Sequence, residues 1–274
     1  MIYFAVTVLG YFAAAGSLYW ALYLRPSSQF AADRDRTSVR SDIVLSVLSS
    51  GIFAICAAVM TAAYELGHTR IYLRSEQYGF WYLGFSLVLV LILQDAYFYF
   101  THRLSHHPKC YRWLHQGHHH SKNPTPWTAF AFDPAEAMIQ ALYLIGVTML
   151  IPMHLSVLVA VVMVMTMGAL IHHFGVRLFP SSAFGRWLGS WMVGCTHHWL
   201  HHRKYTVHYS LYFTFWDRLL GTQYEGYEDI LSPSVEPAVE PAVKSVKLAI
   251  AEKTAEAGEK GRTVIFPVPF DRAS

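Results

Sequence analysis

The sequence predicts an all-α membrane protein, a multi-pass transmembrane helical bundle of about four to five membrane helices with a cytosolic, histidine-rich helical cap. Composition is the first reason, because 54% of the 274 residues are hydrophobic and only 14% are charged. A soluble domain usually carries about 25% charged residues. The other two reasons are a set of long apolar runs and the gathering of fourteen of the sixteen histidines into three short segments.

The first three membrane helices are predicted from apolar runs. Residues 2–24 and 43–64 contain no charged side chain, and both reach the roughly 20 residues that cross a bilayer. Residues 2–24 lack the positively charged start of a signal peptide, which favours a membrane helix there. A third run covers residues 77–94 and ends at Asp95.

A fourth apolar region extends from Ala137 to Ile171. Pro152 and His154 interrupt this region near its middle. We therefore expect a hairpin of two short helices rather than one long span.

The positive charges predict how the bundle is oriented. The loop at residues 25–42 carries four arginines, whereas the loop at residues 65–77 carries two. Positively charged residues favour the cytoplasmic side, so the first loop is expected there. Counting spans from that loop places the segments around His102, His172 and His198 on the same cytoplasmic face.

The chain changes character near Ser232. The stretch "SPSVEPAVEPAVKS" is rich in proline and short repeats, which is typical of an extended linker. We expect two parts, a membrane-embedded domain at residues 1–231 and a proline-rich, mostly disordered C-terminal tail at residues 232–274.

The first histidine pair has helical spacing. His102 and His106 are four residues apart, which places them on one face of a helix that continues the third span. Asp95 lies on the same stripe and is a candidate partner for the second ring nitrogen of a metal-bound histidine. The alternative is that Asp95 only ends the span at the membrane interface.

The pattern His-x-x-His-His occurs twice further along the chain, and positions i, i+3 and i+4 share one helical face. Three imidazoles on one face repel each other when charged, and a metal ion holds them neutral. Imidazole suits iron, zinc, copper and nickel. The residues with this pattern are His115, His118 and His119, and then His198, His201 and His202.

These eight histidines, with His173 as a ninth, are too many for one ion. They are enough for two ions that keep open coordination positions, so the sequence predicts a two-metal site. Other histidines are neighbours of better-placed candidates, lie in turns on the opposite side, or stay undecided. They are His68, His107, His120, His154, His172, His197 and His208.

Ordered motifs give the chain a family resemblance. Over residues 80–225 the motifs "HRLSH", "HQGHH" and "HHWLHH", closing with "FWDRLLGT", resemble the fatty acid hydroxylase and sterol desaturase superfamily of membrane enzymes. The segment "HSKNPTPWTAFAFDPAEA" is similar to the family's segment after the second motif, and "IHHFGV" stands where the family often has an extra histidine. That position is carried onto His173, and less directly onto His172.

The resemblance implies an oxygen-dependent oxidoreductase, a lipid hydroxylase or desaturase that oxidises an unactivated C–H bond with a histidine-bound diiron centre. The substrate would be a sterol, a fatty acyl chain or a related lipid, with O2 as co-substrate. Zinc is expected as a substitute for iron in purified samples. The implied ligands are His102, His106, His115, His118, His119, His173, His198, His201 and His202.

Three stretches depart from the family pattern. Asp133-Pro134 replaces His-Pro before the retained Glu136, "HYSLY" replaces an Asn-Tyr-Gly stretch, and His172 stands where Asn is common. The ligand set is intact. In the closing landmark, Asp217 and Arg218 are expected to pair and to hold the cap.

The implied enzyme needs partners beyond the bilayer and its lipid substrate. The sequence holds no haem, flavin or nucleotide motif, so electrons are expected from a b-type cytochrome or a ferredoxin with its reductase. No nucleic-acid partner is expected. Either an acidic redox partner or anionic head groups would suit six basic residues near the histidines: Arg103, Lys109, Arg112, Lys122, Arg203 and Lys204.

Two further alternatives stay open. The histidines would also suit a metal-binding or metal-transporting membrane protein without oxidase activity, or a structural zinc protein. Transport sites usually lie within the bilayer, and a structural zinc site takes four ligands. Several aromatic residues either line a substrate path or belong to an interfacial belt: Phe80, Trp81, Tyr82, Tyr97, Phe98 and Trp127.

Overall fold

A computed structural model describes residues 1–24, 36–175 and 182–231 of the chain. These residues belong to one compact unit, Met1–Leu231. The predicted C-terminal tail lies outside the described residues, as do Arg25 and Arg34 of the loop used for orientation.

The described chain is built almost entirely from helices, and four of them are long and apolar enough to cross a membrane. The protein is an integral membrane protein with an all-α fold, as predicted. The four helices are α1 (Ile2–Tyr19, continued by a π-helical turn at Trp20–Leu24), α2 (Arg36–Glu65), α3 (Phe80–Ser105) and α6 (Leu155–His172). A shorter apolar helix, α5 (Pro134–Leu150), packs between α2 and α3.

Two predicted boundaries shift in the structure. The second span begins at residue 36 rather than 43, because the polar turn before the apolar run is also helical. The third span begins at Phe80 rather than at residue 77. Its helix continues ten residues past Asp95, as the spacing of the first histidine pair predicts, and its buried face includes Asp95, Tyr99 and His102. The predicted hairpin is confirmed, since α5 ends at Leu150 and α6 begins at Leu155 around Pro152.

The main apolar core lies between α3, α5 and α6. Val90, Val147 and Val161 are buried there together with Met153. Tyr143 joins α5 to α3 by donating its hydroxyl hydrogen to the Val90 carbonyl oxygen at 2.5 Å. Inside a membrane such packing and hydrogen bonding hold helices together, because lipid supplies little hydrophobic driving force between them.

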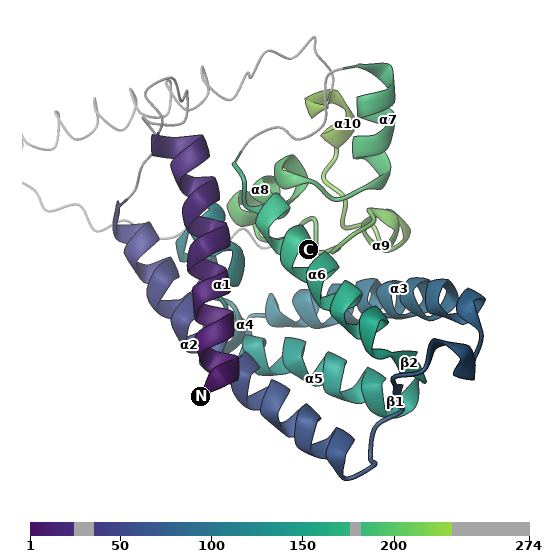
Figure 1. Ribbon diagram of the computed structural model, residues 1–274. Coiled ribbons are helices and arrows are strands. Elements are labelled where there is room, and N and C mark those ends of the chain that lie inside the picture. Colours follow the sequence, from purple (N-terminus) through teal and green to yellow (C-terminus); the bar gives the residue numbers. More distant parts are fainter. Residues whose placement is uncertain (25–35, 176–181, 232–274) are drawn as a thin grey trace, which may run out of the picture. The chain divides into compact units, whose positions relative to one another are not determined.

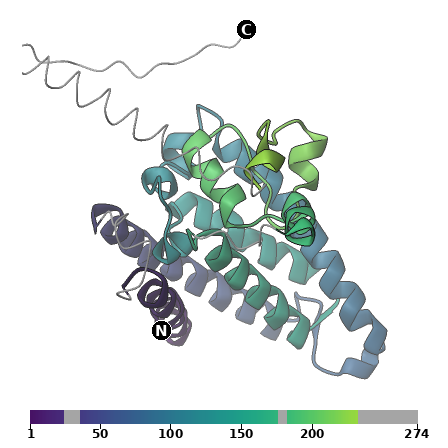
Figure 2. The ribbon, with the colours of Figure 1, turned by 90° about the horizontal axis from the view of Figure 1, so that it is seen from above.

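Helix α1 lies at one edge of the bundle (Figure 2) and packs against α2 and a 3₁₀ turn at Pro126–Phe130. Tyr11 donates its hydroxyl hydrogen to the Trp127 carbonyl oxygen at 3.0 Å. Gly16 permits the close approach of the Trp127 ring, because a Cβ atom there would lie 3.3 Å from it. Trp127 is thus part of the contact between helices.

A pair of short parallel strands closes the end of the bundle opposite the cap. Strand β1 (Ile71–Tyr72) pairs with β2 (Met153–His154). His154 accepts a hydrogen bond from the backbone N–H of Ser156 and so caps α6. The pairing places the turn near His68 and the turn of the α5–α6 hairpin at the same end, as the topology predicts.

Short helices form the cap. They are α4 (Tyr111–Leu114), a 3₁₀ turn at His118–His120, α7 (Ala183–Trp191), α8 (Cys195–Lys204), α9 (Phe215–Leu219) and α10 (Tyr227–Ile230). Figure 1 shows α7, α8, α9 and α10 in the upper part of the view and the β1–β2 pair at the lower right. Helix α8 packs against α6.

The two ends of the bundle should face opposite sides of the membrane. In a variant without its three cysteines, we expect single cysteines at Glu76→Cys and Lys122→Cys to react with a membrane-impermeant maleimide from opposite sides. Both residues are exposed, Glu76 near β1 and Lys122 in the cap. Sealed and opened vesicles measure the labelling. Reaction of both cysteines from the same side would contradict this topology.

Candidate metal centre

Nine histidines meet where the cap covers the ends of α3 and α6. His102 lies in the last turn of α3, and His106 follows directly after that helix. His173 follows the last turn of α6. The remaining six come from the α4 region and from α8: His115, His118, His119, His198, His201 and His202. All nine residues predicted from the sequence are thus brought together.

The histidines form two groups, and within each group one ligand nitrogen per residue lies within 4.8 Å of the others. Group one contains His102, His106, His115, His119 and His201. Group two contains His118, His173, His198 and His202. Each His-x-x-His-His motif therefore supplies both groups.

The two motifs differ in local structure. In α8 the three histidines of the second motif follow regular helical spacing. In the first motif the α-helix ends at Leu114, and His118 and His119 lie in a 3₁₀ turn. The expectation of one helical face was therefore wrong for the first motif. In both motifs the first and third histidines join one group and the middle histidine joins the other, so His118 belongs to group two while His115 and His119 belong to group one.

Within each group the Nε2 atoms converge. In group one the Nε2 atoms of His102 and His115 are 2.9 Å apart, and His201 Nε2 lies 3.1 Å from that of His106 and 3.0 Å from that of His119. In group two His198 Nε2 lies 3.0 Å from the Nε2 atoms of both His173 and His202. The remaining ring, His118, packs against His202 with a centroid separation of 4.7 Å.

The opposite ring nitrogens face backbone carbonyl oxygens. In group two, His118 Nδ1 lies 3.1 Å from Ala131 O, His173 Nδ1 lies 2.6 Å from Ala169 O, and His202 Nδ1 lies 3.0 Å from Ser121 O. In group one the same contact joins His102 to Tyr209 O at 2.9 Å and His201 to Val207 O at 2.7 Å.

These carbonyl contacts assign the tautomers. A carbonyl oxygen can only accept, so each Nδ1 that faces one carries the hydrogen, and Nε2 of a neutral ring then holds a lone pair. In group two this applies to three of the four rings, so His198 alone can supply a hydrogen to the converging nitrogens. A buried polar atom left unsatisfied costs roughly 1–3 kcal/mol. A cation at each point of convergence removes this cost, and the donor set fits a metal ion.

Burial keeps these rings neutral. Burial, together with neighbouring imidazoles, lowers the pKa of His106 to about 2, and burial lowers that of His118 to about 4. The pKa values of five other cap histidines fall well below the usual value for the same reasons: His115, His119, His198, His201 and His202. Neutral imidazole is the form that binds metal.

The other histidines have different surroundings. His107 and His120 are exposed, and His172 is buried beside His198 but belongs to neither group. His197 and His208 stack on each other with ring centroids 3.8 Å apart and also stay outside both groups. His208, which sequence reasoning left undecided, is therefore placed in the packing behind the site.

Asp95 does not contact a histidine of either group. Its Oδ1 atom accepts hydrogen bonds from the backbone N–H groups of Tyr212, at 2.7 Å, and Phe213, at 3.3 Å. The expectation that it orients a metal-bound histidine was therefore wrong. It shares the buried stripe of α3 with His102, but His102 directs Nδ1 to the Tyr209 carbonyl instead.

The carboxylate that does contact the site is Glu136, at the start of α5. Its Oε2 atom lies 2.8 Å from His115 Nδ1, and both side chains are buried. Sequence reasoning noted Glu136 within the family-like segment but gave it no role. An acid in the first turn of an otherwise apolar helix is the signal that would have singled it out.

Asp217 and Arg218 do not pair with each other, so that expectation was also wrong. Arg218 forms an ion pair with Glu228 at 2.9 Å. The Asp217 carboxylate points into the cap and accepts hydrogen bonds from the backbone N–H groups of Tyr209 and Ser210. Consecutive residues of a helix point in different directions, so adjacency in sequence did not produce a pair.

Three of the aromatic residues considered as substrate walls lie in two different places. Phe80 and Trp81 are each 70% exposed at the start of α3, at the β1 end of the bundle, which fits a membrane belt. Phe98 lies on the cap side, with its ring 5.0 Å from that of His102. Only the second location adjoins the histidines.

A cavity of about 650 Å³ opens beside the cap, between α2 and the loop that carries the first motif. Arg40, Arg112 and Asp133 line it together with Val44 and His120. None of the nine clustered histidines is among its lining residues, so this cavity is not the space above the metal-binding nitrogens.

Comparison with known proteins gives a consistent family. A model of the fatty acid hydroxylase family matches residues 87–222, which include all nine histidines. A Delta(7)-sterol 5(6)-desaturase of Gibberella zeae is 31% identical over 57% of this chain and 47% of its own length. Human lathosterol oxidase is 27% identical over 78% of this chain and 70% of its length. No solved structure matches the chain.

A third kind of relative has a name that describes a different activity. A methylsterol monooxygenase of Aspergillus fumigatus is 30% identical over 53% of this chain and 49% of its own length. A second Delta(7)-sterol 5(6)-desaturase, from the same fungus, is matched over 62% of its length. The chain therefore spans between about half and just under two thirds of the length of these three curated relatives.

Substitution of Glu136 should weaken metal binding in group one. Glu136→Ala removes the acceptor for His115 Nδ1, and loss of such a partner typically costs 10–100-fold in metal affinity. Glu136→Gln keeps an acceptor oxygen and should lose much less. Competition with a metal chelator measures both affinities. Equal affinities for the wild type and Glu136→Ala would contradict this role.

Proposed function

We propose that the protein is a member of the fatty acid hydroxylase and sterol desaturase superfamily and an oxygen-dependent lipid oxidase with two iron ions bound by the nine histidines. One observation carries the proposal. Two adjacent groups of buried, neutral imidazoles direct their Nε2 atoms toward two points, and three of the four rings in group two have no hydrogen there. Such a set suits two metal ions with nitrogen ligands.

Iron bound at these groups would supply the reduction of O2 and the cleavage of an unactivated C–H bond. The chain's own residues perform the remaining tasks. The carbonyl oxygens of Ala131, Ala169 and Ser121 hold each group-two ring with its lone pair inward. Glu136 does the same for His115, and the burial of the rings excludes water from the ligand nitrogens.

The substrate class that we propose is a sterol or a similar membrane lipid. Two of the similar proteins carry sterol desaturation or oxidation in their names, and a third carries methylsterol oxygenation. The histidine groups lie at the ends of the membrane helices α3 and α6, so a lipid can approach the site from the bilayer. Hydroxylation and desaturation both consume one O2, two electrons and two protons, and the ligand set suits either.

The histidine groups are proposed to face the cytoplasm. The four arginines at residues 25–42 support this orientation, because positive residues favour that side. Arg40, in the first turns of α2, is exposed near the cap and lines the cavity beside the first histidine motif.

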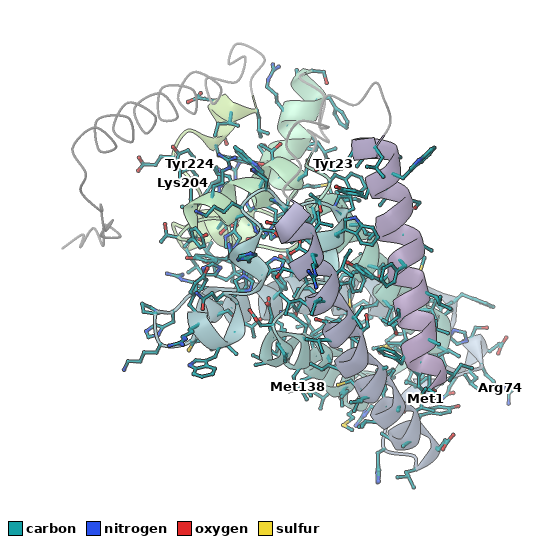
Figure 3. All side chains as sticks on the ribbon, turned by 90° about the vertical axis from the view of Figure 1, so that its left-hand side faces the viewer. Met1, Tyr23, Arg74, Met138, Lys204 and Tyr224 are labelled. Carbon is teal, nitrogen blue, oxygen red and sulfur yellow. The ribbon has the colours of Figure 1, made fainter. Side chains whose placement is uncertain are left out.

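Two electrons per turnover require a separate donor, for which we propose a b-type cytochrome or a ferredoxin. Six basic residues near the histidines are exposed on the cap: Arg103, Lys109, Arg112, Lys122, Arg203 and Lys204. Arg203 stacks over Trp199 at 4.5 Å, and Lys204 lies 5.2 Å from the Tyr224 ring. Figure 3 shows Lys204 and Tyr224 together on the cap, far from Met1 and Arg74.

The competing functions have less support. A transporter would place its ligands near the middle of the membrane, whereas these histidines lie at helix ends and in the cap. A structural zinc site is closed by four ligands. Group one has five histidines and adjoins a second group of four.

The reaction itself can be tested with purified protein in lipid vesicles. With iron, O2 and a reduced electron donor, we expect a Δ7-sterol to yield a hydroxylated or desaturated product by mass spectrometry. Zinc-loaded protein and His201→Ala should yield none. Sterol left unchanged while a fatty acyl lipid is oxidised would contradict the substrate class. No product from any lipid would contradict the oxidase function.

The basic surface can be tested separately. Replacing Arg203 and Lys204 by Ser should slow donor-driven turnover several-fold, more strongly at low salt, because charge complementarity chiefly speeds association. Turnover with a chemical oxidant in place of O2 and the donor should stay the same. Arg74→Ser, at the other end of the bundle, is the matched control. Unchanged donor-driven turnover would rule out docking at these residues.

A further inference from the structure

The carbonyl oxygens that fix the ligand tautomers of group one come from one short loop. Val207 O accepts from His201 Nδ1–H and Tyr209 O accepts from His102 Nδ1–H. The residue between them, His208, has a left-handed backbone with φ of 64°. Such a conformation in a non-glycine residue costs of order 1–3 kcal/mol and persists only where its surroundings hold it.

The surroundings of this loop are anchored by Asp217. Its carboxylate accepts from Tyr209 N–H at 2.8 Å, from Ser210 N–H at 3.1 Å and from the Thr222 hydroxyl at 2.7 Å. The side chain is fully buried. His208 itself is held by its N–H bond to Thr222 O at 2.8 Å and by its stack on His197. The carboxylate thus fixes the loop without touching a histidine of group one.

Group two has a similar support from a different part of the chain. Ser121 O accepts from His202 Nδ1–H, and Ala131 O accepts from His118 Nδ1–H. Asp42, in α2, accepts from the Ser121 hydroxyl at 2.8 Å. It also accepts from the Thr128 hydroxyl at 2.6 Å.

The Thr128 contact links Asp42 to the second carbonyl. Thr128 O accepts the N–H of Ala131 at 3.0 Å, so the segment between Ser121 and Ala131 is fixed at two points by one buried side chain. Asp42 is 1% exposed and lies outside the matched family segment, residues 87–222. We therefore infer the role of Asp42 from its hydrogen bonds and not from the family match.

We propose that Asp217 and Asp42 are positioning residues, each serving one histidine group. Each carboxylate holds the backbone segment whose two carbonyl oxygens keep a pair of ligand rings with Nε2 facing inward. Loss of a carboxylate lets those carbonyls move and lets the rings rotate or change tautomer. The proposal rests on the proposed metal centre, but not on the lipid reaction.

The test crosses each aspartate with a variant that disables one group. His198→Ala leaves group one as the intact site, and His201→Ala leaves group two. In the His198→Ala protein, Asp217→Asn should weaken binding of the remaining ion by about 10–100-fold, the usual effect of losing an indirect partner. Asp42→Asn should have little effect there. In the His201→Ala protein, Asp42→Asn should weaken binding of the remaining ion by the same factor, and Asp217→Asn should have little effect.

Chelator competition, first with zinc alone and then with ferrous iron alone, measures the affinities. Glu228→Gln is the matched control, because Glu228 pairs with Arg218 on the cap surface. Size-exclusion chromatography in detergent reports folding. If an Asn variant does not fold, Thr222→Val and Thr128→Val replace it, since each removes one bond to the same carboxylate and should weaken the same group.

The crossed pattern would support the proposal. Equal weakening of both groups by either aspartate variant would indicate general destabilisation and would overturn it, as would no weakening at all. A wild-type chain that binds no metal would overturn both this proposal and the proposed function. Metal binding with the crossed pattern but no lipid product would contradict the proposed function and leave this proposal standing.

Discussion

The structure depends on hydrogen bonds between histidine Nδ1–H groups and fixed backbone carbonyl oxygens. Each such bond decides which ring nitrogen carries a hydrogen, and so turns a buried imidazole into a donor of one lone pair. In group two, His118, His173 and His202 are held in this way, and their Nε2 atoms converge with that of His198. A metal ion relieves the crowding of lone pairs that this arrangement creates.

The membrane helices make this arrangement possible by holding distant segments together. Helix α3 carries His102 and helix α6 ends beside His173, while α2 and α5 supply Asp42 and Glu136 behind the rings. Buried polar contacts between helices are well tolerated where every donor and acceptor has a partner. The site therefore draws on α2, α3, α5 and α6 and is not confined to the cap.

Much of this could be predicted from the sequence, but some contacts could not. Charge-free runs indicate membrane helices, and histidine spacing indicates ligands, because both depend on residues near each other in the chain. The division into two groups could not be predicted, since it depends on how α3, α6, α8 and the first-motif segment pack together, and residue spacing within one motif does not show this. The predicted contact between Asp95 and a ligand histidine was wrong, because sharing a helical stripe with His102 does not decide which group each side chain contacts. Asp42 is far from every motif.

Diffraction at the iron absorption edge, from crystals of the protein loaded with ferrous iron, would examine the two-metal arrangement most directly. We predict two anomalous peaks per chain, one among the rings of His102 and His201 and one among those of His173 and His202. A single peak between the groups, a peak remote from the histidines, or none at full iron supply would contradict the assignment of one metal ion to each group.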